Sequence, residues 1–100
     1  MSTKAKKYLE KLNKGSLTLG QLINSIRLSE NYSQVRFAEV LGISKSHLCD
    51  IEKGRKSISP QKAAEYADIL GYSPVQFIKL AIQDDLTKSG LKYKVDIKAS

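Results

Sequence analysis

Cysteine and histidine are almost absent from this sequence of 100 residues, which contains one of each, Cys49 and His47. One cysteine excludes an internal disulfide framework and a cysteine-rich zinc site, and one histidine cannot supply a histidine-based metal site. The two residues are two positions apart, so on a helix they point to different faces, and no further ligand is nearby. The sequence therefore predicts no metal site and no cofactor, and Cys49 is interpreted as a small packing residue.

Long apolar runs are absent as well. No segment approaches the roughly 18 consecutive apolar residues of a membrane-spanning helix, and the lysine-rich N-terminus lacks the apolar core of a secretion signal. The length and the 41% share of hydrophobic residues fit one small globular domain with a modest core. We therefore expect a cytoplasmic protein that has no membrane partner.

Catalytic patterns are the third absence. The sequence contains nothing that resembles a nucleophile beside its base, a phosphate-binding loop or a pair of carboxylates spaced for acid–base chemistry. The sequence therefore predicts that the protein is not an enzyme.

The formal net charge of +7 suggests an acidic partner such as nucleic acid, but most of the excess lies near the two ends. Residues 1–17 carry five lysines and one glutamate, residues 18–84 eight basic and seven acidic residues, and residues 85–100 four lysines and two aspartates. Bulk charge alone therefore does not identify the partner. The informative feature is the basic group in the middle of the chain, which consists of Lys45, Lys53, Arg55 and Lys56.

One short pattern recurs five times: an apolar residue, then serine or threonine, then a second apolar residue four positions after the hydroxyl. In this pattern the hydroxyl accepts a bond from a free backbone N–H, and the apolar pair fixes the direction in which the chain enters a helix. The five hydroxyl residues are Thr18, Ser33, Ser44, Ser59 and Ser73. Gln21 and Gln76 are placed to return a bond to their caps, while Pro60 and Pro74 occupy a first helical position, where no N–H is needed.

Glycines mark the expected helix ends at Gly42, Gly54 and Gly71, because glycine tolerates the left-handed conformation that follows a last turn. The starts and stops together predict helices at residues 18–30, 34–41, 45–52, 60–70 and 74–86. Apolar residues at helical spacing line these helices and are assigned to the core. The predicted fold is an all-α bundle of five helices over residues 17–86, preceded by a basic extension, residues 1–16, that could form a further short helix.

The period of the apolar residues changes near the C-terminus. Leu91, Tyr93, Val95 and Ile97 alternate with polar residues, which predicts one β-strand within residues 87–100. A lone strand leaves its backbone groups unpaired, so we expect it to pair with the same strand of a second copy and to act as a dimerisation element. Two alternatives stay open, a disordered tail and a strand completed by a toxin or another protein partner.

The stretch from Ser33 to Gly54, SQVRFAEVLGISKSHLCDIEKG, contains two short helical patterns separated by Gly42. Two short helices joined at a glycine inside a small bundle are typical of a helix-turn-helix. The second helix would bury Leu48 and Ile51. Its other residues, Lys45, Ser46, His47, Cys49 and Asp50, are short, polar or chargeable, as reading base edges in a major groove requires.

Residues 22–73 resemble the Xre, Cro and lambda-repressor-like DNA-binding domains. The resemblance is carried, in order, by Arg27, Ser33-Gln34, Phe37-Ala38, Leu41-Gly42-Ile43-Ser44, Ile51-Glu52-Lys53-Gly54-Arg55, Ala67 and Leu70-Gly71. The resemblance implies a five-helix bundle of the lambda-repressor type in which the helix at residues 45–52 reads the DNA. It also implies an internal ion pair between Arg27 and Glu52, which would otherwise be two solvated charges.

The resemblance implies a DNA-binding role for nine residues. Gln34 would bond a phosphate and brace the reading helix, and Ser44 would cap that helix while facing the DNA backbone. Lys45, Ser46 and Asp50 match the family's base-contacting positions, with His47 beside them, while Lys53, Arg55 and Lys56 are placed for phosphates. Asp50 is a departure, because a carboxylate near phosphates weakens binding unless it accepts from a cytosine N4 amine or is held by a neighbouring lysine.

These observations predict a sequence-specific transcriptional regulator that binds double-stranded DNA as a homodimer on an inverted-repeat operator. Two other functions stay open. The protein could be the antitoxin of a toxin-antitoxin pair, in which a terminal segment binds the toxin, or a protein-interaction module that retains the fold without binding DNA. The nearly neutral body of the chain and Asp50 are the features that favour the last of these.

Overall fold

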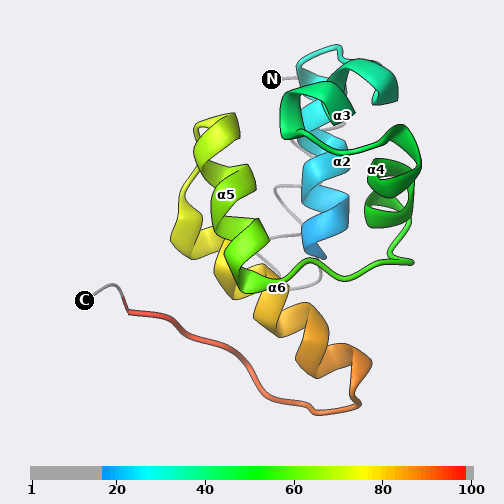
Figure 1. Cartoon of the computed structure of the whole chain (residues 1–100). Helices are drawn as coiled ribbons and strands as arrows, with labels where there is room; N and C mark the ends of the chain where they lie inside the picture. Colours follow the sequence, from blue (N-terminus) through cyan, green and yellow to red (C-terminus); the bar gives the residue numbers. More distant parts are fainter. Residues whose placement is uncertain (1–16, 99–100) are drawn as a thin grey trace. The chain divides into compact units, whose positions relative to one another are not determined.

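The computed structural model describes residues 17–98, and within this range it contains five α-helices (Figure 1). They are α2 Leu19–Ser29, α3 Gln34–Leu41, α4 Lys45–Glu52, α5 Pro60–Leu70 and α6 Pro74–Lys88. The prediction of an all-α fold with five helices is therefore confirmed, and α3, α4 and α5 have the predicted bounds at both ends. The extension predicted for residues 1–16 lies outside the described residues.

All five helices begin at the predicted hydroxyl residues. Each hydroxyl oxygen accepts a bond from the backbone N–H three positions later, at distances between 3.0 and 3.4 Å. The Gln21 side chain returns a bond of 3.0 Å to the Thr18 N–H and so completes a reciprocal cap. Gln76, for which the same bond is predicted, donates only its backbone N–H to Ser73 within the part of the chain that the structure describes.

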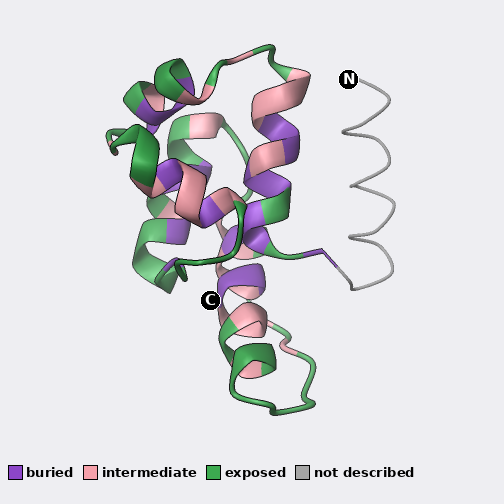
Figure 2. Cartoon of the chain, turned by 90° about the vertical axis from the view of Figure 1, so that its right-hand side faces the viewer, coloured by how far each residue is buried: buried purple, intermediate pink, exposed green. Residues whose placement is uncertain are grey.

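The chain divides into two compact units, Met1–Lys56 and Ser57–Ser100. The first unit contains α2, α3 and α4, and Figure 2 colours the chain by the burial of each residue. The buried apolar residues of this unit are Leu17, Leu19, Leu22, Ile23, Ile26, Phe37, Ala38, Leu41, Leu48 and Ile51. Because α3 and α4 each bury only one stripe of residues, each leaves a polar face turned to solvent.

The turn between α3 and α4 depends on Gly42. Its φ of 73° lies in the left-handed region, where a residue with a Cβ is strained. The Gly42 N–H donates to the Glu39 oxygen at 3.1 Å, and the Ile43 N–H donates to the Ala38 oxygen at 3.0 Å, which closes the end of α3. Ser44 then caps α4 only two residues later. The result is the helix-turn-helix that the sequence predicts.

Gly20 brings two backbones of the first unit into contact. It lies near the start of α2, and a Cβ built on it would overlap the backbone oxygen of Ile51 near the end of α4. The close approach is available only because glycine has no side chain. The position of the end of α4 is thus set by direct contact with the backbone of α2.

The second unit consists of α5, α6 and the segment that follows. Its buried residues are Ile58, Ala63, Tyr66, Ala67, Phe77, Leu80 and Ala81, and the Phe77 ring lies 6.0 Å from the ring of Tyr72, centroid to centroid. A helix turns by about 100° per residue, so a second apolar stripe on α6, formed by Val75, Ile78, Ile82 and Leu86, lies on the side opposite Phe77, Leu80 and Ala81. These four residues are half-buried.

The C-terminal β-strand is the one element that the sequence predicts wrongly. Residues 91–98 have no regular secondary structure, and no part of residues 17–98 is a strand; Figure 1 draws the segment without an arrow. Leu91 and Tyr93 are exposed, with 47% and 68% of their surface accessible, while Val95 and Ile97 are half-buried. A strand needs a neighbouring strand for its hydrogen bonds, and the described part of this helical chain supplies none.

A single side chain of α6 takes the place of a neighbouring strand. The Gln83 amide nitrogen donates to the Tyr93 oxygen at 2.8 Å, and the Gln83 amide oxygen accepts from the Val95 N–H at 3.0 Å. The two bonds hold the backbone on both sides of Lys94 against the helix. Val95 and Ile97 are half-buried in this arrangement, whereas Leu91 and Tyr93 are exposed, so the alternating residues do not share one covered face.

None of the helices within residues 17–98 combines the length and the apolar content that crossing a bilayer requires.

Candidate nucleic-acid interface

The outward face of α4 is built by the residues that the helix does not bury. Leu48 and Ile51 are buried in the first unit, which turns the intervening positions toward solvent. Lys45 and Ser46 are exposed, and His47, Cys49 and Asp50 are half-buried. At the start of the helix the Ser44 hydroxyl accepts from the His47 N–H at 3.0 Å, so Ser44 acts as the cap.

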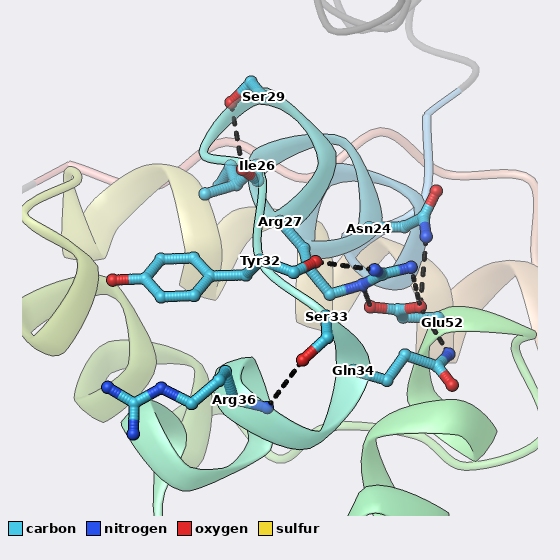
Figure 3. A network of polar contacts seen from close by, with 9 residues as sticks. All are labelled: Asn24, Ile26, Arg27, Ser29, Tyr32, Ser33, Gln34, Arg36 and Glu52. Atoms are coloured by element: carbon cyan, nitrogen blue, oxygen red, sulfur yellow. Dashed lines mark hydrogen bonds and ion pairs between the residues drawn. The ribbon is translucent and has the colours of Figure 1, made fainter.

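Glu52, at the end of α4, is the centre of a polar network that Figure 3 shows from close by. The Arg27 Nε donates to Glu52 Oε2 at 2.7 Å, and the Arg27 Nη2 donates to Glu52 Oε1 at 3.2 Å. Oε1 also accepts from the side-chain amides of Asn24 and Gln34, each at 3.0 Å. One carboxylate therefore joins α2, α3 and α4.

The Arg27 and Glu52 side chains form a largely buried ion pair and are not two solvated charges. Only 13% of the Arg27 side chain and 4% of the Glu52 side chain are accessible. The remaining Arg27 nitrogen, Nη1, donates to the backbone oxygen of Tyr32 at 3.0 Å, so the guanidinium also holds the segment that leads into α3. Every nitrogen of this guanidinium thus has a partner, as a buried charge requires.

The network lowers the pKa of the Glu52 carboxyl from its ordinary value of 4.5. Burial acts in the opposite direction and raises this pKa, because a desolvated carboxylate is costly. The hydrogen bonds from Arg27, Gln34 and Asn24, together with the Arg27 charge, favour the ionised form more strongly, and the net pKa falls. Glu52 is therefore ionised at neutral pH and attracts all three donors.

Gln34, at the first position of α3, faces Glu52 with its amide nitrogen. The bond braces α3 against the end of α4. Figure 3 shows the carbonyl oxygen of this amide directed away from Glu52. An amide nitrogen carries two hydrogens, and the bond to Glu52 uses one of them.

The segment after α4 folds back onto its last turn. Gly54 has a φ of 77°, and the N–H groups of Arg55 and Lys56 both donate to the backbone oxygen of Asp50, at 2.8 and 3.3 Å. The Arg55 Nη1 also lies 3.4 Å from Asp50 Oδ1. The side chains of Lys53, Arg55 and Lys56 are exposed, so three basic groups lie just beyond the end of α4.

The structure places the predicted site residues in two groups. Gln34 and Glu52 come together with Arg27, while Asp50 pairs with Arg55 and not with a lysine. Asn24 was not identified from the sequence, although it lies one turn before Arg27 on the same side of α2. Within residues 17–98, no three of the histidine, cysteine, aspartate and glutamate side chains are grouped as metal ligands would be.

A family model described as helix-turn-helix matches residues 23–77 of the chain, which is more than half of its length. Neither a curated protein nor a solved structure matches the chain significantly. The matched range includes the whole of α3, α4 and α5, together with Arg27 and Glu52.

Proposed function

The chain belongs to the Xre and lambda-repressor-like helix-turn-helix family, and on this premise we propose that it is a sequence-specific transcriptional regulator that binds the major groove of double-stranded DNA with α4. The family is one of DNA-binding regulators, and the observation that carries the proposal is the outward face of α4. This face presents Lys45, Ser46 and Asp50, is capped by Ser44 and is braced by Gln34 and Glu52.

The basic groups after α4 support the second part of the proposal, which is the contact with phosphates. Lys53, Arg55 and Lys56 are exposed beside the end of the helix, and Gln34 offers an amide hydrogen at the start of α3. Contacts to phosphates fix the register of a protein on DNA but carry no sequence information. Lys45, Ser46 and Asp50 thus select bases, whereas the basic groups and Gln34 supply affinity for any sequence.

Replacing Lys53 or Lys56 by glutamine is expected to weaken binding to every duplex, because each replacement removes one phosphate contact. The slope of log K against log salt concentration should become shallower by about one unit per lost contact, while the preferred sequence stays the same. Fluorescence anisotropy with a labelled duplex, repeated at several salt concentrations, measures both quantities.

Lys79→Gln is the matched control, since it removes the same charge from α6, a helix to which the proposal assigns no contact with DNA. Its slope should equal that of the unchanged protein. If Lys53→Gln and Lys56→Gln bind with an unchanged slope, the placement of α4 on DNA is wrong.

We further propose that the protein acts as a homodimer on an inverted repeat, with the seam on the second unit. The support is the half-buried stripe of Val75, Ile78, Ile82 and Leu86 on α6, together with the exposed Leu91 and Tyr93 after it. Apolar residues at this spacing are the pattern with which one helix packs on another. A two-fold dimer would place two reading helices about 34 Å apart, one turn of DNA.

Ile82→Glu is expected to convert the dimer into a monomer, because it places a charge in the middle of the stripe. Sedimentation equilibrium should give twice the chain mass of 11.1 kDa for the unchanged protein and the chain mass for the variant. Gln76→Glu adds the same charge at an exposed position of α6 and should leave the dimer intact. An unchanged protein that is monomeric at tens of micromolar would exclude the homodimer and favour a different protein partner.

A further inference from the structure

The outward face of α4 carries one side chain that can only accept hydrogen bonds. Lys45 and Ser46 can donate, and Lys53 donates just beyond the helix, but the ionised carboxylate of Asp50 has no proton to offer. About 29% of the Asp50 side chain is accessible, so the group is neither buried in the core nor fully solvated. Such a group discriminates strongly between bases, because most base edges in the major groove also present acceptors.

Arg55 makes this carboxylate compatible with a DNA surface. Its Nη1 lies 3.4 Å from Asp50 Oδ1, and the backbone turn that places it there is closed by two bonds to the Asp50 backbone oxygen. Oδ2 has no hydrogen-bond partner among residues 17–98 and stays open to a ligand. Arg55 has five N–H donors, so its guanidinium can hold Oδ1 and a phosphate at the same time.

Resting on the proposed function, we propose that Asp50 selects a cytosine in each half-site of the operator. Cytosine presents its N4 amine as a donor in the major groove, and Oδ2 of Asp50 is the acceptor for it. Guanine presents O6 and N7 and thymine presents O4, all of which are acceptors that repel a carboxylate. Adenine presents a donor at N6, but its N7 acceptor lies beside that donor and also repels the charge.

Arg55 is assigned a supporting part in this selection. The Arg55 charge beside Oδ1 reduces the repulsion between the Asp50 carboxylate and the DNA phosphates. Oδ2, the oxygen that meets the base, stays unoccupied by any of the described residues. Replacing Arg55 by alanine should therefore weaken binding to all duplexes and leave the preference for cytosine in place.

Selection of bound sites from a random duplex library tests the assignment, with the full chain and with Asp50→Asn selected in parallel. The unchanged protein should enrich cytosine at one position of each half-site. Asp50→Asn should enrich adenine at that same position, because an asparagine amide donates to N7 and accepts from N6 of adenine. The exchange should alter relative affinity by about tenfold at that position and leave the other positions unchanged.

Asp68→Asn makes the same chemical change at an exposed position of α5 and should reproduce the sites of the unchanged protein. Thermal unfolding of each variant is measured as a control, to establish that the variant is folded at the temperature of the selection. If the unchanged protein enriches a site and Asp50→Asn enriches the identical site, Asp50 is only the partner of Arg55, and the cytosine assignment is wrong. If the unchanged protein enriches no site, the proposed function fails and this assignment falls with it.

Discussion

Replacing Arg27 by alanine is expected to lower the free energy of unfolding by about 3 kcal/mol, because it leaves the Glu52 carboxylate in the first unit without its counterion. Only 4% of the Glu52 side chain is accessible, so its charge is compensated by protein groups rather than by water. Arg27 also holds the Tyr32 oxygen, which would lose its partner in the same variant. Replacing Glu52 by alanine should cost a similar amount, because Arg27 would then be a charge without a counterion.

Denaturant unfolding followed by circular dichroism measures this loss. Arg36→Ala is the matched control, since Arg36 pairs with Glu39 on the surface of α3, where 68% and 58% of the two side chains are accessible. Loss of that pair should cost no more than about 0.5 kcal/mol. If Arg27→Ala costs as little as Arg36→Ala, the network around Glu52 does not hold the three helices together.

The lowered pKa of Glu52 gives the same network a dependence on pH. The group binds protons more weakly in the folded state than in the unfolded chain, so it stabilises the fold above the ordinary pKa of 4.5. This stabilisation is lost as the pH falls through the lower folded pKa. The deficit of Glu52→Gln relative to the unchanged protein should therefore shrink below pH 4.5. A deficit that stays constant down to about pH 3 would contradict this assignment.

Replacing Gly20 by alanine is expected to lower the free energy of unfolding by about 2 kcal/mol and to displace the end of α4. The new Cβ would overlap the backbone oxygen of Ile51, which cannot relieve the overlap by a change of rotamer as a flexible side chain could. Overpacking typically costs about 1 to 3 kcal/mol and occasionally more. The better helix propensity of alanine offsets about 1 kcal/mol of this cost.

Gly71→Ala is the control that separates a loss of stability from a displacement of α4. A Cβ on Gly71 meets nothing within 4 Å, but the φ of 78° is strained for alanine, so this variant should lose about 1 kcal/mol. Gly71→Ala should keep its affinity for DNA at a temperature where it is folded, while Gly20→Ala should lose affinity because α4 has moved. A Gly20→Ala protein with unchanged stability would show that α2 and α4 do not meet at this point.

The local parts of this fold could be predicted from the sequence because their causes are local. Ser33, Ser44 and Ser59 bond the N–H three positions later, and the bond depends on no other part of the chain. Gly42 ends α3 through its own backbone conformation. These features gave the bounds of the central helices without any knowledge of packing.

The parts that depend on contacts between distant residues could not be predicted in the same way. Asn24 and Glu52 are 28 positions apart, and no periodicity in the sequence indicates their bond. The C-terminal alternation predicts a strand, but a strand also requires a neighbour, and the segment instead meets the side chain of Gln83. Asp50 meets Arg55 because the turn at Gly54 brings the chain back, which residue types alone do not reveal.

The most direct test of the central claim is a comparison of the affinity of the full chain for its selected duplex with its affinity for an unrelated duplex of equal length. We predict that the selected duplex binds at least about a thousandfold more tightly at physiological salt, and that both affinities fall steeply as salt increases. Equal affinities for the two duplexes, or no binding to either at low salt, would contradict the assignment of α4 as a helix that reads DNA sequence.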